Sequence, residues 1–175
     1  MNWGHYLFSF SGRINRAKAW LFVLVGIGFA IVAFTLIASA FGLEHIANVM
    51  QRKEPPTVLS GNAVALAVCA LVGLAYLVFI FSAFAVVVKR LHDRNKSAWW
   101  LVVFYLIPFV LNGYRLSTVM GAMHHGEMAY AGNPIATAAG GIAALISLWA
   151  FVEIYCLSGT NGDNRYGPDP LAGRR

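Results

Sequence analysis

Four long apolar stretches separated by polar segments dominate the chain. They cover about residues 19–43, 62–88, 98–119 and 134–157. Each exceeds the roughly 20 apolar residues that an α-helix needs to cross about 30 Å of hydrocarbon. The pattern predicts an all-α, polytopic membrane protein: a four-helix transmembrane bundle in which residues 1–175 form a single membrane domain.

The third stretch is the least regular, because Pro108, Asn112 and Arg115 interrupt it. Proline lacks a backbone N–H, so a carbonyl of the preceding turn loses its partner. Lipid cannot satisfy that carbonyl. We therefore expect Pro108 to face protein and not lipid.

Residues 1–17 precede the first stretch and carry aromatic residues at helical spacing. Trp3, Tyr6, Leu7, Phe10 and Ile14 share one face if the segment is helical. This spacing predicts an N-terminal amphipathic helix lying in the membrane interface. An irregular aromatic anchor is the alternative.

The basic residues are distributed unequally between the two sides of the predicted membrane. Three precede the first span, four follow the second and three lie in the tail at residues 158–175, so ten of the 13 Lys and Arg residues share one side. The positive-inside rule makes that side cytoplasmic. We expect a multi-pass protein of the bacterial inner (plasma) membrane with both termini in the cytoplasm.

Composition agrees with a membrane protein, since 59% of the residues are hydrophobic and only 11% are charged. Soluble domains carry about 25% charged residues. The net charge of +6 would raise the question of nucleic acid in a soluble protein. Here the basic residues flank apolar spans, so topology explains them and no nucleic-acid partner is expected.

Three polar segments, residues 10–16, 89–100 and 159–170, fall on the predicted cytoplasmic side and define a candidate polar cap. We expect Asp163, Asp169 and the amides of Asn161 and Asn164 to dock on Arg13, Arg16 or Arg90. Alternatively, Arg165 points at Asp93. A merely solvated tail is the alternative. The residues of the polar cap are Arg13, Arg16, Arg90, His92, Asp93, Arg94, Asn161, Asp163, Asn164, Arg165, Tyr166 and Asp169.

Two charged residues, Glu153 and Arg115, lie within predicted spans. An ionised carboxylate in the bilayer needs a partner or water. We expect Glu153 to pair with Lys89, Arg90 or Arg16, and a proton or cation site is the alternative. Arg115 is expected to extend to the outer headgroups.

The sequence contains no catalytic constellation, and we predict no metal or cofactor. The adjacent His124 and His125 with Glu127 lack a fourth ligand, and His92–Asp93 lacks the further residues of a metal phosphohydrolase. No phosphate-binding glycine loop or zinc-protease motif is present.

The three polar segments carry a family resemblance. Gly12-Arg-Ile-Asn-Arg16, Arg90-Leu-His-Asp93 and the run Gly159–Pro170 resemble, in order, the signatures of a bacterial inner-membrane family called domain of unknown function 805. The residues from Asn95 to Ala98 depart from the pattern, where the family often has a glycine. The resemblance implies a small multi-helix inner-membrane protein and no settled activity.

These observations favour an integral inner-membrane protein that is not an enzyme. Its basic cytoplasmic cap would engage anionic lipid headgroups or a partner protein, and a homo-oligomer is a further option. A small transporter or channel subunit using Glu153 is one alternative. A membrane enzyme at the cytoplasmic face, with His92 and Asp93 as acid or base, is another.

Overall fold

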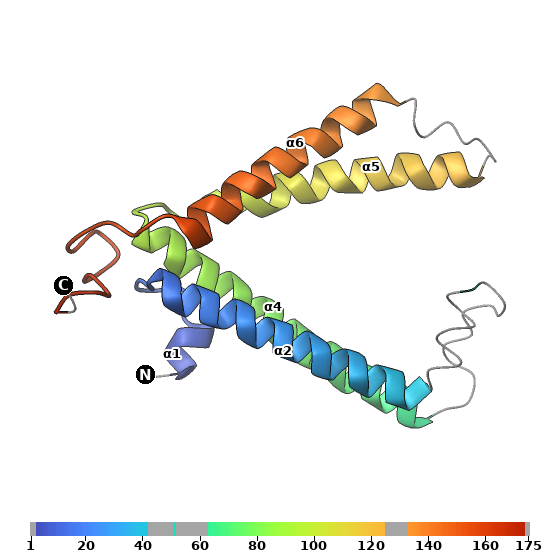
Figure 1. The fold of residues 1–175 in the computed structure, drawn as a ribbon, viewed down its shortest axis with the longest axis horizontal. Helices are drawn as coiled ribbons and strands as arrows, with labels where there is room; N and C mark the ends of the chain where they lie inside the picture. The colour runs from blue at the N-terminus through green and yellow to red at the C-terminus, as the bar shows by residue number, and fades with distance from the viewer. Residues whose placement is uncertain (1–2, 42–50, 52–62, 125–132, 174–175) are drawn as a thin grey trace. The chain divides into compact units, whose positions relative to one another are not determined.

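The computed structural model describes residues 3–41, 51, 63–124 and 133–173. All the long elements among these residues are helices (Figure 1). Among these described residues, four helices are long and apolar enough to cross a membrane, which confirms the predicted all-α class with four candidate spans. The elements in chain order are α1 (Trp3–Phe8), α2 (Arg16–Phe41), α4 (Ala63–Asp93), the π-helical turn η1 (Val102–Leu106), α5 (Ile107–His124), α6 (Pro134–Phe151) and the π-helical turn η3 (Val152–Cys156).

The described residues fall into two compact units. The first unit comprises residues 1–9 and 20–86 and contains α1 with most of α2 and α4. In it, Phe79 of α4 stacks on Phe22 and Phe29 of α2, with ring centroids 4.8 and 5.4 Å apart. A Cβ atom at Gly26 would lie 2.7 Å from Cζ of Phe79, so glycine permits this close approach.

Helix α1 is shorter than the aromatic pattern predicted. It spans six residues, Trp3–Phe8, and Phe10 and Ile14 lie beyond its end. Phe8 stacks on Phe81 of α4 at 6.2 Å. The placement of α1 in the membrane interface remains a prediction.

The second unit comprises residues 10–19 and 87–175 and contains α5, α6 and their π-helical turns. The side chains that α6 buries recur every three, four or seven residues, as expected for one helical face. They are all alanine: Ala136, Ala139, Ala143 and Ala150. Small residues let the backbones of α5 and α6 approach closely where lipid supplies no hydrophobic drive.

The irregular third span remains helical from Val102 to His124. Pro108 follows the π-helical turn η1, and its side chain is buried, as the sequence predicted. Asn112 donates a 2.9 Å hydrogen bond to the Pro108 carbonyl. The wider turn of a π-helix gives room for the proline ring, which would otherwise clash with the carbonyl of residue i−4.

Helix α4 continues five residues beyond its predicted end at residue 88 and stops at Asp93. The N–H of Lys96 donates to the Leu91 carbonyl (2.8 Å) and that of Asn95 to the His92 carbonyl (2.9 Å), which is the hydrogen-bond pattern of a Schellman motif. Asn95 has φ 57°. Asparagine tolerates this left-handed conformation, so it can stand where a glycine is usual. The last turn of α4 thus carries Arg90 and Asp93 on a well-defined helix end.

Candidate functional site

The polar cap is built around the carboxylate of Asp93, which two arginines share. Arg13 Nη2 lies 3.1 Å from Oδ1 and Arg90 Nη1 contacts Oδ2. The side chains of Arg13, Arg90 and Asp93 are 1, 0 and 4% exposed. Both oxygens of one buried carboxylate therefore neutralise positive charge that would otherwise be costly to bury.

Arg13 ties the N-terminal segment to the tail. Its Nε donates to Asp93 (3.2 Å), Nη1 donates to the carbonyls of Gly162 (2.7 Å) and Gly167 (3.2 Å), and Nη2 donates to the carbonyl (2.7 Å) and hydroxyl (3.2 Å) of Thr160. A guanidinium has five N–H donors. Five acceptors therefore match the full donor capacity of Arg13.

Three other arginines cap the carbonyl end of the last helix. Arg90 donates to the carbonyls of Ile154 (2.8 Å) and Leu157. Arg16 donates to the Cys156 carbonyl (2.8 Å), and Arg94 to that of Ser158 (2.6 Å). The final carbonyls of a helix lack intrahelical partners and carry partial negative charge. Cations at this position satisfy both needs.

The tail also caps the end of α4. Thr160 donates from its N–H (2.8 Å) and its hydroxyl (3.1 Å) to the Asp93 carbonyl. Asn164 donates from Nδ2 to the His92 carbonyl (2.9 Å). A Cβ atom at Gly159 would lie 2.5 Å from Cγ of Asp93, so the tail backbone passes directly against the shared carboxylate.

His92 and Tyr166 stack face to face, with ring centroids 3.9 Å apart and planes at 4°. His92 Nδ1 lies 3.3 Å from the Gly12 carbonyl, which joins all three polar segments. Arg165 lies over the Tyr166 ring at 4.8 Å and donates to the Asn95 carbonyl (3.2 Å). Arg165 therefore contacts the α4 end through this carbonyl and not through Asp93.

The tail acids organise the tail itself. Asp163 accepts a hydrogen bond from the N–H of Asp169 (3.0 Å) in place of the expected arginine contact. Asp169 accepts from the N–H groups of Gly162 (3.1 Å) and Leu171 (2.9 Å). The side chain of Asn161 is exposed in the same segment. These turns hold the carbonyls that Arg13 needs in one place.

Glu153 forms an ion pair, but its partners differ from those expected from the sequence. Its Oε1 lies 2.9 Å from Arg94 Nε and 3.1 Å from Lys96 Nζ, and its side chain is 5% exposed. The ammonium of Lys96 also lies over the Trp100 ring at 4.1 Å and near that of Trp149 at 5.6 Å. The loop after α4 is thereby fixed to α6 and η3.

Substitution of Lys96 by glutamine should lower the free energy of unfolding by about 1–2 kcal/mol, because a partly exposed ion pair and a cation–π contact are lost together. Unfolding in mixed detergent micelles measures the change. Lys96→Arg is the matched control and should retain most of the stability. Equal stability of Lys96→Gln and the wild type would show that the contact contributes nothing.

Arg115 lies apart from the polar cap contacts, on α5. Its Cδ would be 3.0 Å from a Cβ atom at Gly140 of α6, so its side chain crosses α6 at a glycine. The expected extension to outer headgroups remains a prediction. The part of the chain that the structure describes holds no group of three or more His, Cys, Asp or Glu residues that could bind a metal. His125 and Glu127 lie outside the described residues.

Sequence reasoning missed several participants, chiefly Gly159, Thr160 and Lys96. Thr160 stands inside a recognisable motif, so the motif offered a signal for it. Most acceptors of the arginines are backbone carbonyls, and every residue has one. Nothing in the side-chain sequence distinguishes the carbonyls that are used.

Comparison with known proteins agrees with these motifs. The family model described as "Protein of unknown function (DUF805)" matches residues 7–168, which include the first two polar segments and the third as far as Pro168. The chain belongs to the DUF805 family. This membership confirms the resemblance seen in the sequence.

Three of the relatives are proteins of Escherichia coli K12 that are named as inner-membrane or uncharacterized proteins. Inner membrane protein YhaH is 26% identical over 163 residues, which cover 92% of this chain and 86% of YhaH. The uncharacterized protein YiiR is 29% identical (94% of this chain, 87% of YiiR), and inner membrane protein YhaI is 26% identical (94% and 87%). No solved structure matches this DUF805 chain.

Proposed function

We propose that this DUF805 protein is a non-enzymatic inner-membrane protein whose polar cap has two layers with different tasks. The inner layer, Arg13, Arg90 and Asp93, braces the helix ends. The outer layer, here called the basic rim, consists of Arg16 and Arg165 and engages anionic lipid headgroups on the cytoplasmic side. The positive-inside distribution of Lys and Arg supports that side.

The observation that carries this proposal is the contrast in how the arginines use their donors. Arg13 directs five donor contacts inward, and the side chain of Arg90 is fully buried. Arg16 and Arg165 are exposed residues, and each donates to one carbonyl among the described residues. Their remaining N–H donors suit phosphate oxygens.

The alternatives receive less support from the same contacts. A cation path through Glu153 would compete with Arg94 and Lys96, which already neutralise that carboxylate. An acid or base role for Asp93 would break its pairing with Arg13 and Arg90. His92 is covered on one face by Tyr166. A brace with a basic rim leaves each of these contacts in place.

The test compares thermal unfolding of the full chain in vesicles of phosphatidylcholine with and without phosphatidylglycerol. We expect phosphatidylglycerol to stabilise the wild type at low salt. The gain in stability should be about 2 kcal/mol smaller in the Arg16→Gln/Arg165→Gln variant, because each cation near an anionic surface contributes about 1 kcal/mol. High salt should remove the difference. Arg16→Lys/Arg165→Lys, which keeps both charges, is the matched control and should be stabilised as much as the wild type.

Equal stabilisation of the wild type by both lipids at low salt would contradict the lipid proposal. If the rim variant then also lost a crosslinked protein neighbour in its native membrane, the rim would serve a protein partner instead.

A further inference from the structure

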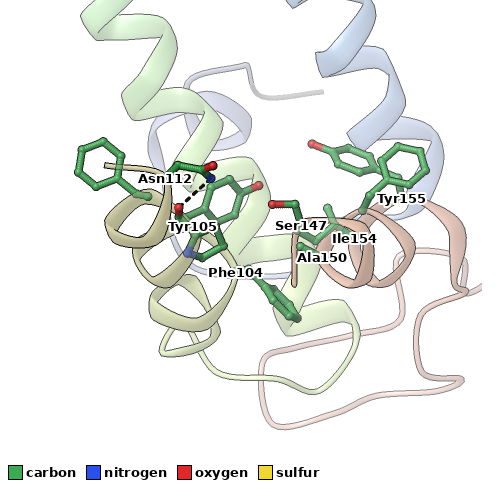
Figure 2. A pocket seen from close by; sticks show the side chains of 10 residues that line it. Phe104, Tyr105, Asn112, Ser147, Ala150, Ile154 and Tyr155 are labelled. Atoms are coloured by element: carbon green, nitrogen blue, oxygen red, sulfur yellow. Dashed lines mark hydrogen bonds between the residues drawn. The ribbon is translucent and has the colours of Figure 1, made fainter. Parts of the chain in front are cut away.

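A groove lies between the η1–α5 segment and the α6–η3 segment in the second unit (Figure 2). Its volume is about 310 Å³. Phe104, Tyr105 and Pro108 line one side, and Ser147, Ala150 and Tyr155 line the other. These residues belong to two candidate membrane spans, Val102–Gly121 and Pro134–Cys156, so the groove is expected to lie within the hydrocarbon or at its edge.

The two helices that form the groove both change to π-helical winding at the same end. Phe104 and Tyr105 belong to η1, and Ile154 and Tyr155 belong to η3. Isolated π-helical turns within α-helices are frequent at functional sites. The small side chains of Ser147 and Ala150 leave the space that the larger aromatic side chains surround. The groove is therefore formed jointly by residues of both helices and does not depend on a single small side chain.

The dimensions suit a single hydrocarbon chain. Eight residues separate Ser147 from Tyr155, so the groove runs for about 12 Å along the helix at 1.5 Å per residue. Phe109 and Phe151 flank the groove with exposed fractions of 75 and 45%, which leaves an apolar opening.

A cation contacts the backbone one residue beyond the groove lining, at the end of η3 that carries polar-cap contacts. Tyr155 lines the groove, and the carbonyl of the next residue, Cys156, accepts the hydrogen bond from the exposed Arg16 (2.8 Å). Arg16 also begins α2, whose N-terminal turn is capped by Asn15 and carries partial positive charge. An amphiphile with its chain in the groove would place an anionic headgroup against Arg16.

We propose that the α5–α6 groove is a binding site for one acyl chain of an anionic phospholipid, with its phosphate on Arg16. This proposal rests on the proposed function and deepens it, because it turns a general attraction to anionic lipid into a defined site. The rim supplies the charge selectivity and the groove supplies the contact with the chain.

The test uses phosphatidylglycerol that carries a photoactivatable diazirine in its acyl chain, in phosphatidylcholine vesicles with the full chain. Crosslinks mapped by mass spectrometry should concentrate on residues that line the groove. Ser147→Phe should reduce them at least about fivefold, because the aromatic ring would occupy the groove. Ala138→Phe is the matched control. Ala138 is exposed and lies nine residues before Ser147, which places it on the opposite face of α6. This variant should leave labelling unchanged.

Arg16→Gln separates the two proposals. We expect it to lower the preference for labelled phosphatidylglycerol over labelled phosphatidylcholine about fivefold, the equivalent of one cation near an anionic surface. Loss of preference in Arg16→Gln with full labelling in Ser147→Phe would overturn the groove site and leave the lipid function intact. Absence of any preference in the wild type would overturn both.

Discussion

Substitution of Asp93 by asparagine is expected to lower the free energy of unfolding by about 3–5 kcal/mol, the usual cost of removing one partner from a buried ion pair. The amide cannot neutralise Arg13 and Arg90, whose side chains are 1 and 0% exposed. One amide oxygen also cannot replace two carboxylate oxygens as acceptors. Unfolding in mixed detergent micelles measures the loss.

The matched control is Asp163→Asn. Asp163 is exposed and accepts a hydrogen bond from the N–H of Asp169, a bond that an amide oxygen can also accept. The expected change is therefore below about 1 kcal/mol. Similar losses in the two variants would mean that Asp93 is not the centre of the brace.

A methyl group at Gly159 is expected to disrupt the same centre by steric overlap. The Cβ atom of Gly159→Ala would lie 2.5 Å from Cγ and 2.7 Å from Oδ1 of Asp93, so the tail or the carboxylate must move. Overpacking of this kind costs about 1–3 kcal/mol, and displacement of the Asp93 carboxylate from its arginines adds to that cost.

Gly141→Ala controls for the general effect of adding a methyl group. A Cβ atom at Gly141 meets nothing within 4 Å, and its position inside α6 favours alanine over glycine by up to about 1 kcal/mol. The two variants should therefore change the free energy of unfolding in opposite directions. A neutral Gly159→Ala would show that the tail does not rest on Asp93 in the folded protein.

The Gly159 contact illustrates a limit of motif reading. Among the described tail glycines, Gly162, Gly167 and Gly173 have a positive φ and Gly159 does not. The backbone conformation alone would therefore accept another residue. The requirement for glycine comes from a carboxylate 66 residues earlier in the chain, which local sequence cannot reveal.

Some of the polar cap could be predicted because helical periodicity is local. Arg90 and Asp93 are three residues apart, so they meet on any helix that continues past residue 90. The sequence also predicted that Glu153 pairs with a cation, since a carboxylate in a membrane span needs a partner. The sequence did not identify which cations these are. Arg94 follows directly after the end of α4, and the left-handed residue Asn95 turns the chain so that Lys96 reaches the same carboxylate of Glu153.

The sequence by itself determined the membrane class, the four spans, the grouping of three polar segments and the family. These properties depend on long runs of apolar residues, on charge counts and on short motifs, all of which act through local or additive free energies. Only the tertiary structure decided that Asp93 is shared by two arginines, that Arg13 binds tail carbonyls and that a groove opens beside the π-helical turns. The contacts of Arg13 with Asp93 and the tail join residues 80 to 154 apart in the chain, and the two sides of the groove come from different helices. Backbone carbonyls are the same in every residue, so the sequence cannot show which of them Arg13 uses.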